Sequence, residues 1–319
     1  MATGRFRTIS LLHTSVASTN VGDEIIMAAV DNQLAPVLGE DYVNRIASHE
    51  RMSSKSRGMI AKADYAIAGG SNLLSSHAGI RSVWKLTPFD ATLGKKFVMM
   101  GVGWYHDQGA PDPYTAWLYK SLFSREMLHS VRDNYSKEKL NRLGFSNVVN
   151  TGCPTLWELP DDINARIPHQ KSENVVTTLN TYMKDRAADA ALLEILKRKY
   201  RRVFAWVQTY TDEAYLKDLF PDIELIAPNL AAYDALLASG SDLDYVGNRL
   251  HAGIRALQKG RRTVIIEIDN RAREMGRDFH LPTVARNDWE GLERMIDGPT
   301  ELRIALPRET IRKWLDQWK

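Results

Sequence analysis

Hydrophobic and polar positions alternate along this chain in blocks typical of strands and helices that follow one another. Short apolar runs bounded by turn residues predict buried parallel strands, such as residues 96–102. Between these runs, apolar residues recur at helical spacing. In residues 24–34, for example, Ile25, Ile26 and Ala29 share one face. Strands that alternate with helices indicate parallel sheets covered by helices on both faces.

The alternation forms two series separated by residues 160–172, which are rich in Pro and Asp and lack periodicity. We interpret this segment as an interdomain linker. The strands predicted before it are residues 6–13, 43–48, 64–68, 96–102 and 128–131, and the helices are residues 24–34, 53–62, 114–123 and 136–143. The strands predicted after it are residues 174–179, 202–207, 224–227, 243–246 and 263–268, and the helices are residues 186–199, 212–219, 230–238, 249–259, 271–277 and 288–296.

Two such series predict an α/β protein with two Rossmann-like domains that face each other across a cleft. A length of 319 residues suits two domains of about 150 residues each. We place the N-terminal domain at residues 1–165, the C-terminal domain at 172–300 and a final helix at 301–319. In such sheets, ligands bind at the carboxyl ends of the strands, where this chain carries its polar turns.

The final segment, residues 307–319, places Ile311, Trp314, Leu315 and Trp318 on one helical face. Two interpretations are open. A helix of this kind can lie on a membrane surface. More often it packs back across the domain junction as part of the core, which is the interpretation we favour.

Composition narrows the class of protein. Apolar residues make up 44% and charged residues 25% of the chain, as in soluble globular proteins. The net charge of +3 is too weak to indicate a nucleic-acid partner. The one cysteine, Cys153, has no neighbouring base and is expected to be a buried structural thiol. Because residues 1–7 lack an apolar signal and no run approaches a membrane span, we expect a cytoplasmic protein, at most bound to the inner face of the membrane.

The most informative local pattern is a strand that turns into a helix over residues 242–254, with Arg249 and His251 in the first helical turn. Unpaired N–H groups and the helix dipole make such a turn suitable for an anion. Arg249 would add a forked positive charge and His251 a proton-transfer group. The alternative is a helix that merely begins with an exposed arginine and a satisfied histidine.

Other polar turns follow other predicted strands. Asn20-Val21-Gly22-Asp23 lacks the glycines of a dinucleotide-binding loop, so Asp23 is either a helix cap or a general base. Gly70 and Ser71 would let backbone approach a ligand, although a simple tight turn uses the same residues.

Two arginines follow predicted strands as well. Arg132 pairs in sequence with Asp133, which suggests either a structural ion pair with a helix cap or a ligand contact. Arg271 follows the strand after residues 243–246, so adjacent parallel strands would bring it near Arg249 as a second cation.

Several other chemistries lack their motifs. The histidines have no metal-ligand spacing, and neither a Walker A loop nor a G-x-S-x-G motif is present. A metal-independent reaction on an anionic substrate is the remaining prediction.

An ordered set of motifs runs through most of the chain. It comprises N-V-G-D-E at residues 20–24, A-G-G-S-N at 68–72, S-V-R-D at 130–133, T-G-C-P-T at 151–155, G-N-R-L-H at 247–251 and E-I-D-N-R at 267–271. This set resembles the polysaccharide pyruvyl transferase family. The resemblance implies a GT-B-like fold, phosphoenolpyruvate as donor, and a sugar of a polysaccharide or lipid-linked glycan as acceptor. The product would be a pyruvate ketal bridging two hydroxyls, as in exopolysaccharide biosynthesis.

The resemblance also suggests roles for individual residues. The donor-binding Arg-Leu-His triplet of the family falls on Arg249, Leu250 and His251, in the domain on the donor side. We assign catalysis to His251 and Asp23. The predicted substrate-binding residues are Arg249, Leu250, Arg271, Asn20, Gly70, Ser71 and Arg132. No metal or cofactor is expected, and phosphoenolpyruvate would be a co-substrate.

The sequence departs from the family pattern at two positions. Ser71 stands where the family has a third glycine, which would reshape the acceptor side, and Arg271 stands where a lysine is common, which changes the geometry of the charge. Two alternatives stay open. One is a GT-B glycosyltransferase that uses a nucleotide sugar, and the other is a non-catalytic scaffold in exopolysaccharide assembly.

Overall fold

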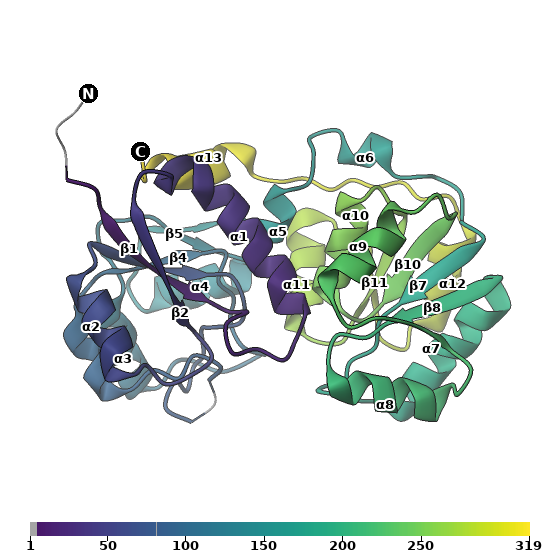
Figure 1. Cartoon of the computed structure of the whole chain (residues 1–319), viewed down its shortest axis with the longest axis horizontal. Coiled ribbons are helices and arrows are strands. Elements are labelled where there is room, and N and C mark those ends of the chain that lie inside the picture. The colour runs from purple at the N-terminus through teal and green to yellow at the C-terminus, as the bar shows by residue number, and fades with distance from the viewer. Residues whose placement is uncertain (1–4, 81) are drawn as a thin grey trace. The chain divides into compact units, whose positions relative to one another are not determined.

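The computed structural model describes residues 5–80 and 82–319, and the chain forms two compact α/β units (Figure 1). Residues 1–4, part of the segment expected to lack a signal, lie outside the described residues. Unit 1 contains Ile26–Trp157, Leu306–Lys319 and the residues up to Ser18, whereas unit 2 contains Thr19–Ile25 and Glu158–Ala305. The polar turn at Asn20 therefore belongs with the second unit, which chain order alone does not predict.

Unit 1 is built on a parallel sheet with strand order β2-β1-β3-β4. A parallel pair, β5 and β6, continues beside β4 through a bridge between Val102 and Val131. The strands are β1 (Thr8–His13), β2 (Tyr42–Ala47), β3 (Tyr65–Gly69), β4 (Phe97–Met100), β5 (His129–Val131) and β6 (Val148–Asn150). The helices are α1 (Gly22–Leu38), α2 (Ser54–Lys62), the 3-10 helix η1 (Pro88–Leu93), α3 (Pro113–Leu122), α4 (Asn134–Arg142), α5 (Pro154–Trp157) and α13 (Arg308–Asp316).

Side chains of successive strand positions alternate between two cores of unit 1, as the two-residue period of a strand requires. Leu12 and Ala68 enter one core with residues of α2, α3 and α4. Leu11 and Ile67 enter the other with residues of α1 and α13. The sheet is thus covered on both faces, as the apolar runs of its strands predict.

The C-terminal helix α13 completes the second of these cores, beside α1 (Figure 1). Trp314 and Trp318 are 0% exposed, and the ring of Trp318 packs edge-on against Tyr65 at 5.7 Å. The prediction of a helix that returns as core is confirmed. The interfacial alternative does not hold, because the apolar face that would enter a membrane is already buried.

Unit 2 is built on a parallel sheet with strand order β12-β11-β10-β7-β8-β9. The strands are β7 (Asn174–Thr177), β8 (Arg202–Trp206), β9 (Glu224–Ile226), β10 (Leu243–Gly247), β11 (Thr263–Glu267) and β12 (Thr283–Ala285). The helices are α6 (Ile163–Arg166), α7 (Arg186–Lys199), α8 (Tyr210–Leu219), α9 (Leu230–Ala238), α10 (Leu250–Gln258), α11 (Asn270–Phe279) and α12 (Trp289–Asp297).

The order of these strands reverses between β7 and β10. From β7 the chain moves outward through β8 and β9, and from β10 it moves outward in the opposite direction through β11 and β12. Connections on the two sides of this point run to opposite faces of the sheet, so the loops after β7 and β10 diverge. Ligands of doubly wound sheets bind where the loops part in this way.

Five segments differ from the predictions, and two of them are the short helices η1 and α5, which were not predicted. Strands β6 and β12 were not predicted, because each has three residues and shows too little pattern. The segment expected as a bare linker contains α6 and packs onto unit 2. Ile163 and Ile167 are each 3% exposed, and Asn164 hydrogen-bonds both the N–H and the carbonyl of Ile304.

Two further expectations concern Cys153 and the membrane. Cys153, the one cysteine of the sequence, is 0% exposed, in keeping with a structural thiol. Among the described helices, none combines the length and the apolar character that crossing a bilayer requires.

Acid should weaken the folded state through His129. Burial lowers the pKa of this residue to about 4, and its Nδ1 accepts a hydrogen bond from Met99 N–H. Below about pH 6.5 the unfolded chain binds a proton at His129 while the folded chain does not. The contribution of neutral His129 to the unfolding free energy is therefore fully present above pH 6.5 and is lost as the pH falls towards 4. We expect the unfolding free energy to fall by up to about 1.4 kcal/mol per pH unit in this window.

Urea unfolding between pH 7.5 and 4.5, followed by tryptophan fluorescence, measures this slope. His129→Gln should reduce the slope, whereas the exposed control His169→Gln should leave it unchanged. Equal slopes in the wild type and His129→Gln would contradict the assignment.

Candidate functional site

Helix α10 begins differently from its neighbours in unit 2. Its N-cap residue is Arg249, whose side chain makes no capping hydrogen bond. Side-chain caps do occur at α7, α8, α9, α11 and α12, from Asp185, Thr209, Asn229, Asp269 and Asp288. The turn is also buried, with Leu250 at 5% and His251 at 8% exposure. A buried helix N-terminus without a capping side chain favours an anion at that point.

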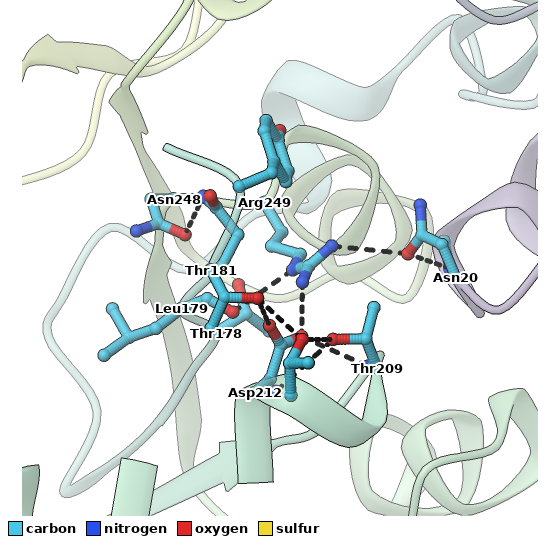
Figure 2. A network of polar contacts seen from close by, with 12 residues as sticks. Asn20, Thr178, Leu179, Thr181, Thr209, Asp212, Asn248 and Arg249 are labelled. Atoms are coloured by element: carbon cyan, nitrogen blue, oxygen red, sulfur yellow. Dashed lines mark hydrogen bonds and ion pairs between the residues drawn. The ribbon is translucent and has the colours of Figure 1, made fainter. Parts of the chain in front are cut away.

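Arg249 is held by three groups from separate parts of unit 2 (Figure 2). Its Nε donates to the carbonyl of Leu179 at 3.2 Å, its Nη1 donates to Asn20 Oδ1 at 3.3 Å, and its Nη2 forms an ion pair with Asp212. Arg249 is 6% exposed and Asp212 is 0% exposed. Arg249 is therefore a buried and paired cation, not the exposed arginine of the alternative interpretation. These bonds engage three of the five guanidinium N–H groups, and two are left for a ligand.

Asp212 is fixed by the start of helix α8. Its carboxylate accepts from the N–H of Thr209 at 3.1 Å and from the hydroxyl of Thr181 at 3.2 Å, and Thr209 in return caps the helix (Figure 2). This reciprocal capping box fixes Asp212 Oδ2, and the same oxygen accepts from Arg249. The Thr209-Tyr210-Thr211-Asp212 pattern predicts a helix start, but no local signal predicts its partner 37 residues away.

The backbone at Arg249 is fixed where β7 and β10 part. Asn248 N–H donates to the carbonyl of Thr178 at 3.0 Å, and the Tyr245 hydroxyl donates to the carbonyl of Arg249 at 2.8 Å. Gly247 permits this approach, because a Cβ there would lie 2.7 Å from the backbone nitrogen of Thr178. Arg249 thus sits at the switch point of the sheet, on rigid rather than loose structure.

The predicted residues of the first polar turn lie in this same unit. Val21 N–H donates to the carbonyl of Gln208 at 3.1 Å, and Asn20 Oδ1 accepts from Gly22 N–H at 3.1 Å as well as from Arg249. The structure therefore brings together Asn20 and Arg249, which are 229 residues apart. Asp23 is 7% exposed and lies within the first turn of α1, so it is not the cap of that helix.

Arg271 also forms an ion pair, with Asp269. Asp269 caps α11 and accepts from Arg271 Nε at 2.8 Å. Burial acts to lower the pKa of Arg271, but the charges of Asp269 and Tyr182 and the hydrogen bonds to both together outweigh burial, and the pKa is raised. The ring of Tyr182 lies 5.4 Å from the guanidinium of Arg271 and 5.8 Å from that of Arg249. Arg249 and Arg271 thus lie near the same tyrosine ring, and each forms an ion pair with a different carboxylate.

Gly70 and Ser71 lie in unit 1, at the end of β3. Both have a left-handed backbone, with φ of 61° and 65°. A Cβ at Gly70 would lie 2.3 Å from Ile26 Cγ2, so only glycine fits. Ser71 pays a strain of about 1 kcal/mol that a glycine would avoid, and its carbonyl accepts from Gly103 N–H at 2.8 Å.

Arg132, also in unit 1, is 0% exposed. Its Nη1 donates to Asn72 Oδ1 at 2.6 Å and its Nε to Asp133 at 3.2 Å, while Asp133 caps α4. The structural ion pair and the cap are both present. Its Nη2 is buried without a hydrogen-bond partner among the described residues, so a ligand contact would have to form at that nitrogen.

The sequence reasoning missed one array of ionisable groups, at the carboxyl end of β1. Ser15 Oγ lies 3.0 Å from His13 Nδ1, and His13 Nε2 lies 3.6 Å from Asp31, which also pairs with Arg45 at 3.1 Å. The interaction with His13 lowers the pKa of Asp31, and Arg45 lowers it further. Together these two effects outweigh burial, so the pKa stays below its usual value. His13 ends a predicted strand, but the partner on α1 lies too far along the chain for a motif to reveal it.

Metal ligation has no support in the part of the chain that the structure describes, where no three His, Cys, Asp or Glu side chains gather as ligands could.

Two doubly wound units with parallel sheets define a GT-B-like α/β protein, and solved structures share this fold. A putative UDP-N-acetylglucosamine 2-epimerase from Listeria monocytogenes superposes with a TM-score of 0.52, 10% identity, and coverage of 98% of this chain and 91% of that one. The S. aureus MnaA–UDP co-structure gives a TM-score of 0.51, 11% identity, and coverage of 92% and 88%. At such low identity the likeness concerns the fold alone.

The sequence identifies the family. The model of the polysaccharide pyruvyl transferase family matches residues 20–270, and the chain belongs to that family. None of the curated protein sequences matches it.

Removing the Asp212 carboxylate should destabilise unit 2. Asp212→Asn leaves the buried Arg249 charge without its counter-ion, which costs about 3–5 kcal/mol of unfolding free energy. The matched control on the same helix is Asp218→Asn, whose ion pair with Arg186 is exposed and should be worth no more than about 1 kcal/mol.

Urea unfolding of both variants measures the difference. Equal losses would show that the Arg249–Asp212 pair does not hold this part of the unit together.

Proposed function

We propose that this protein transfers the pyruvyl group of phosphoenolpyruvate to two hydroxyls of one sugar in a polysaccharide or lipid-linked glycan. The products are a pyruvate ketal and phosphate. Membership of the polysaccharide pyruvyl transferase family supports the kind of reaction. The observation that supports the donor most is the buried first turn of α10, which lacks a capping side chain and begins with Arg249.

Phosphoenolpyruvate carries a phosphate and a carboxylate close together, so its site needs several convergent donors. In this proposal the backbone N–H groups of the first turn of α10 bind one anionic group, aided by the helix dipole. The two remaining N–H groups of Arg249 bind the other. The pairing with Asp212 and Asn20 orients the guanidinium in advance, which reduces the entropy lost on binding. Arg271, whose guanidinium lies near the same Tyr182 ring as that of Arg249, adds a further N–H donor.

The chemistry follows from the two reactants. A proton adds to the methylene carbon of the donor, and one sugar hydroxyl attacks the adjacent carbon as it gives up its own proton. Phosphate then leaves, and the second hydroxyl closes the ketal with loss of its proton. His251 in the first turn of α10 either donates the proton to carbon or binds phosphate as imidazolium. No step calls for a metal or a further cofactor.

A hydroxyl nucleophile needs a base, and two groups qualify. Asp23 is the carboxylate proposed from the sequence. The second is the Ser15–His13–Asp31 array, in which Ser15 could pass a proton to His13 while Asp31 stabilises the resulting charge.

Substitution of the base should lower kcat by about 10²–10⁴ without changing the affinity for phosphoenolpyruvate. The comparison of Asp23→Asn with His13→Gln decides which residue acts. The variant that keeps wild-type kcat over the whole pH range identifies the residue that is not the base. Wild-type kcat in both variants would exclude both assignments.

Loss of the donor-side groups should reduce activity by different amounts. Arg249→Ala removes charged hydrogen bonds of about 1.5–3 kcal/mol, which corresponds to a fall in kcat/KM of roughly ten- to a hundred-fold or more. His251→Ala should lower kcat by about 10²–10⁴. Arg186→Ala, on the exposed surface of the same unit, is the control and should leave the rate unchanged. A His251→Ala enzyme within a few-fold of the wild type would contradict a role in proton transfer.

The reaction itself is tested by mass spectrometry of candidate glycans incubated with protein and phosphoenolpyruvate. The proposal requires an added mass equal to that of pyruvic acid less one water. A thermal-shift titration separates the alternatives, because a ligand at a hundred times its Kd stabilises by about 2.7 kcal/mol. Stabilisation by UDP or GDP and not by phosphoenolpyruvate would favour a nucleotide-sugar enzyme.

A further inference from the structure

A hollow of about 860 Å³ lies in unit 1, well within the size range of ligand pockets. Three loops line it. They contribute His49 after β2, then Ile80, Ser82, Val83 and Lys85 between β3 and β4, and residues 105–108 after β4. Because these strands are parallel and adjoin β1 in one sheet, all three loops leave its carboxyl edge. Doubly wound sheets bind their ligands at this edge.

A hollow of about 720 Å³ in unit 2 does not share this position. It lies beside Thr263 and Thr283, the first residues of β11 and β12, at the amino edge of that sheet. Arg249 follows the opposite, carboxyl edge. The hollow in unit 1 is therefore the one that the topology favours as a ligand site.

The wall of the hollow formed after β4 is fixed by hydrogen bonds to the rest of unit 1. Tyr105 N–H donates to the carbonyl of Leu74 at 2.7 Å. Gln108 Oε1 accepts from Ser76 N–H at 2.6 Å, and Gln108 N–H donates to the hydroxyl of Tyr135 at 2.9 Å. These bonds keep the hollow open before any ligand arrives, so little ordering is needed on binding.

Backbone strain marks the same wall. His106 has a φ of 55°, a left-handed conformation that a residue with a Cβ adopts at a cost of about 1 kcal/mol or more. Such strain persists only where the surroundings impose it, and it concentrates at binding sites. The ring of His106 meets that of Tyr105 edge-on at 4.1 Å, which places two flat side chains together on the lining.

The lining mixes flat or apolar surfaces with hydrogen-bonding groups. Tyr105 and the 87% exposed Ile80 offer surface for the C–H face of a sugar ring. His49, His106 and Asp107 offer donors and acceptors for its hydroxyls. Among the described residues of the lining the one lysine, Lys85, already donates to the carbonyl of Ser82 at 2.6 Å, which leaves little charge for a nucleotide phosphate.

We propose that this hollow binds a sugar ring of the acceptor glycan, with Tyr105 and His106 as the residues that recognise it. The identification of the bound sugar as the acceptor rests on the proposed function. The binding of a sugar ring does not, because it follows from the hollow and its lining.

Saturation-transfer NMR in the absence of phosphoenolpyruvate tests the binding. The probes are disaccharides that end in galactose, glucose, mannose or N-acetylglucosamine. We expect the full-length wild type to bind at least one of them, and Tyr105→Ala and His106→Gly to weaken that binding by tenfold or more. His106→Gly suits the left-handed backbone, so it removes the ring without a folding penalty. Tyr42→Ala, at a 66% exposed tyrosine of unit 1 outside the hollow, is the control and should bind as the wild type does.

Binding of none of the probes, or equal binding by all four proteins, would overturn the sugar site. Glycan pyruvylation with an acceptor KM unchanged in Tyr105→Ala would overturn it too, while the proposed function would stand. Sugar binding that the two variants lose, without any pyruvyl transfer by the wild type, would support the site and leave the proposed function without support.

Discussion

The start of helix α10 depends on one buried interaction, the ion pair between Arg249 and Asp212. Removing two charges from water is unfavourable unless each finds further hydrogen bonds. Here Arg249 also reaches Asn20 and the carbonyl of Leu179, and Asp212 also accepts from Thr209 and Thr181. The network joins the loops after β7, β8 and β10 to the start of α1. The network therefore fixes the N-terminus of α10. Among the described helices of unit 2, α10 is the one whose N-cap residue is an arginine.

This pairing changes the physical account of anion binding. A free arginine would attract a phosphate by net charge, whereas Arg249 and Asp212 together carry none. In the proposed site an anion would instead be attracted by oriented dipoles, namely the backbone N–H groups of α10 and the remaining N–H groups of the Arg249 guanidinium. Such preorganised groups are effective in a buried site, because they need little rearrangement when the ligand binds. The same holds for Arg271, whose charge is offset by Asp269.

Much of the fold could be predicted from the sequence. The apolar runs and helical periods locate β7, β10 and α10, because a parallel strand covered on both faces has few other patterns. The strand-to-helix turn at Arg249 is likewise a local feature. The partner of Arg249 was not predictable, since Asp212 reads as a helix cap and its second role depends on strand order. The placement of Asn20 in unit 2 is also a long-range outcome, and chain order suggests the opposite.

The central claim is that the first turn of α10 binds phosphoenolpyruvate. Amide resonances of the isotope-labelled protein, recorded during a titration with this ligand, test it most directly. The account predicts that the largest shifts belong to the N–H groups of Leu250, His251 and Ala252, with saturation. Saturable shifts confined to other regions, or none at all, would contradict it.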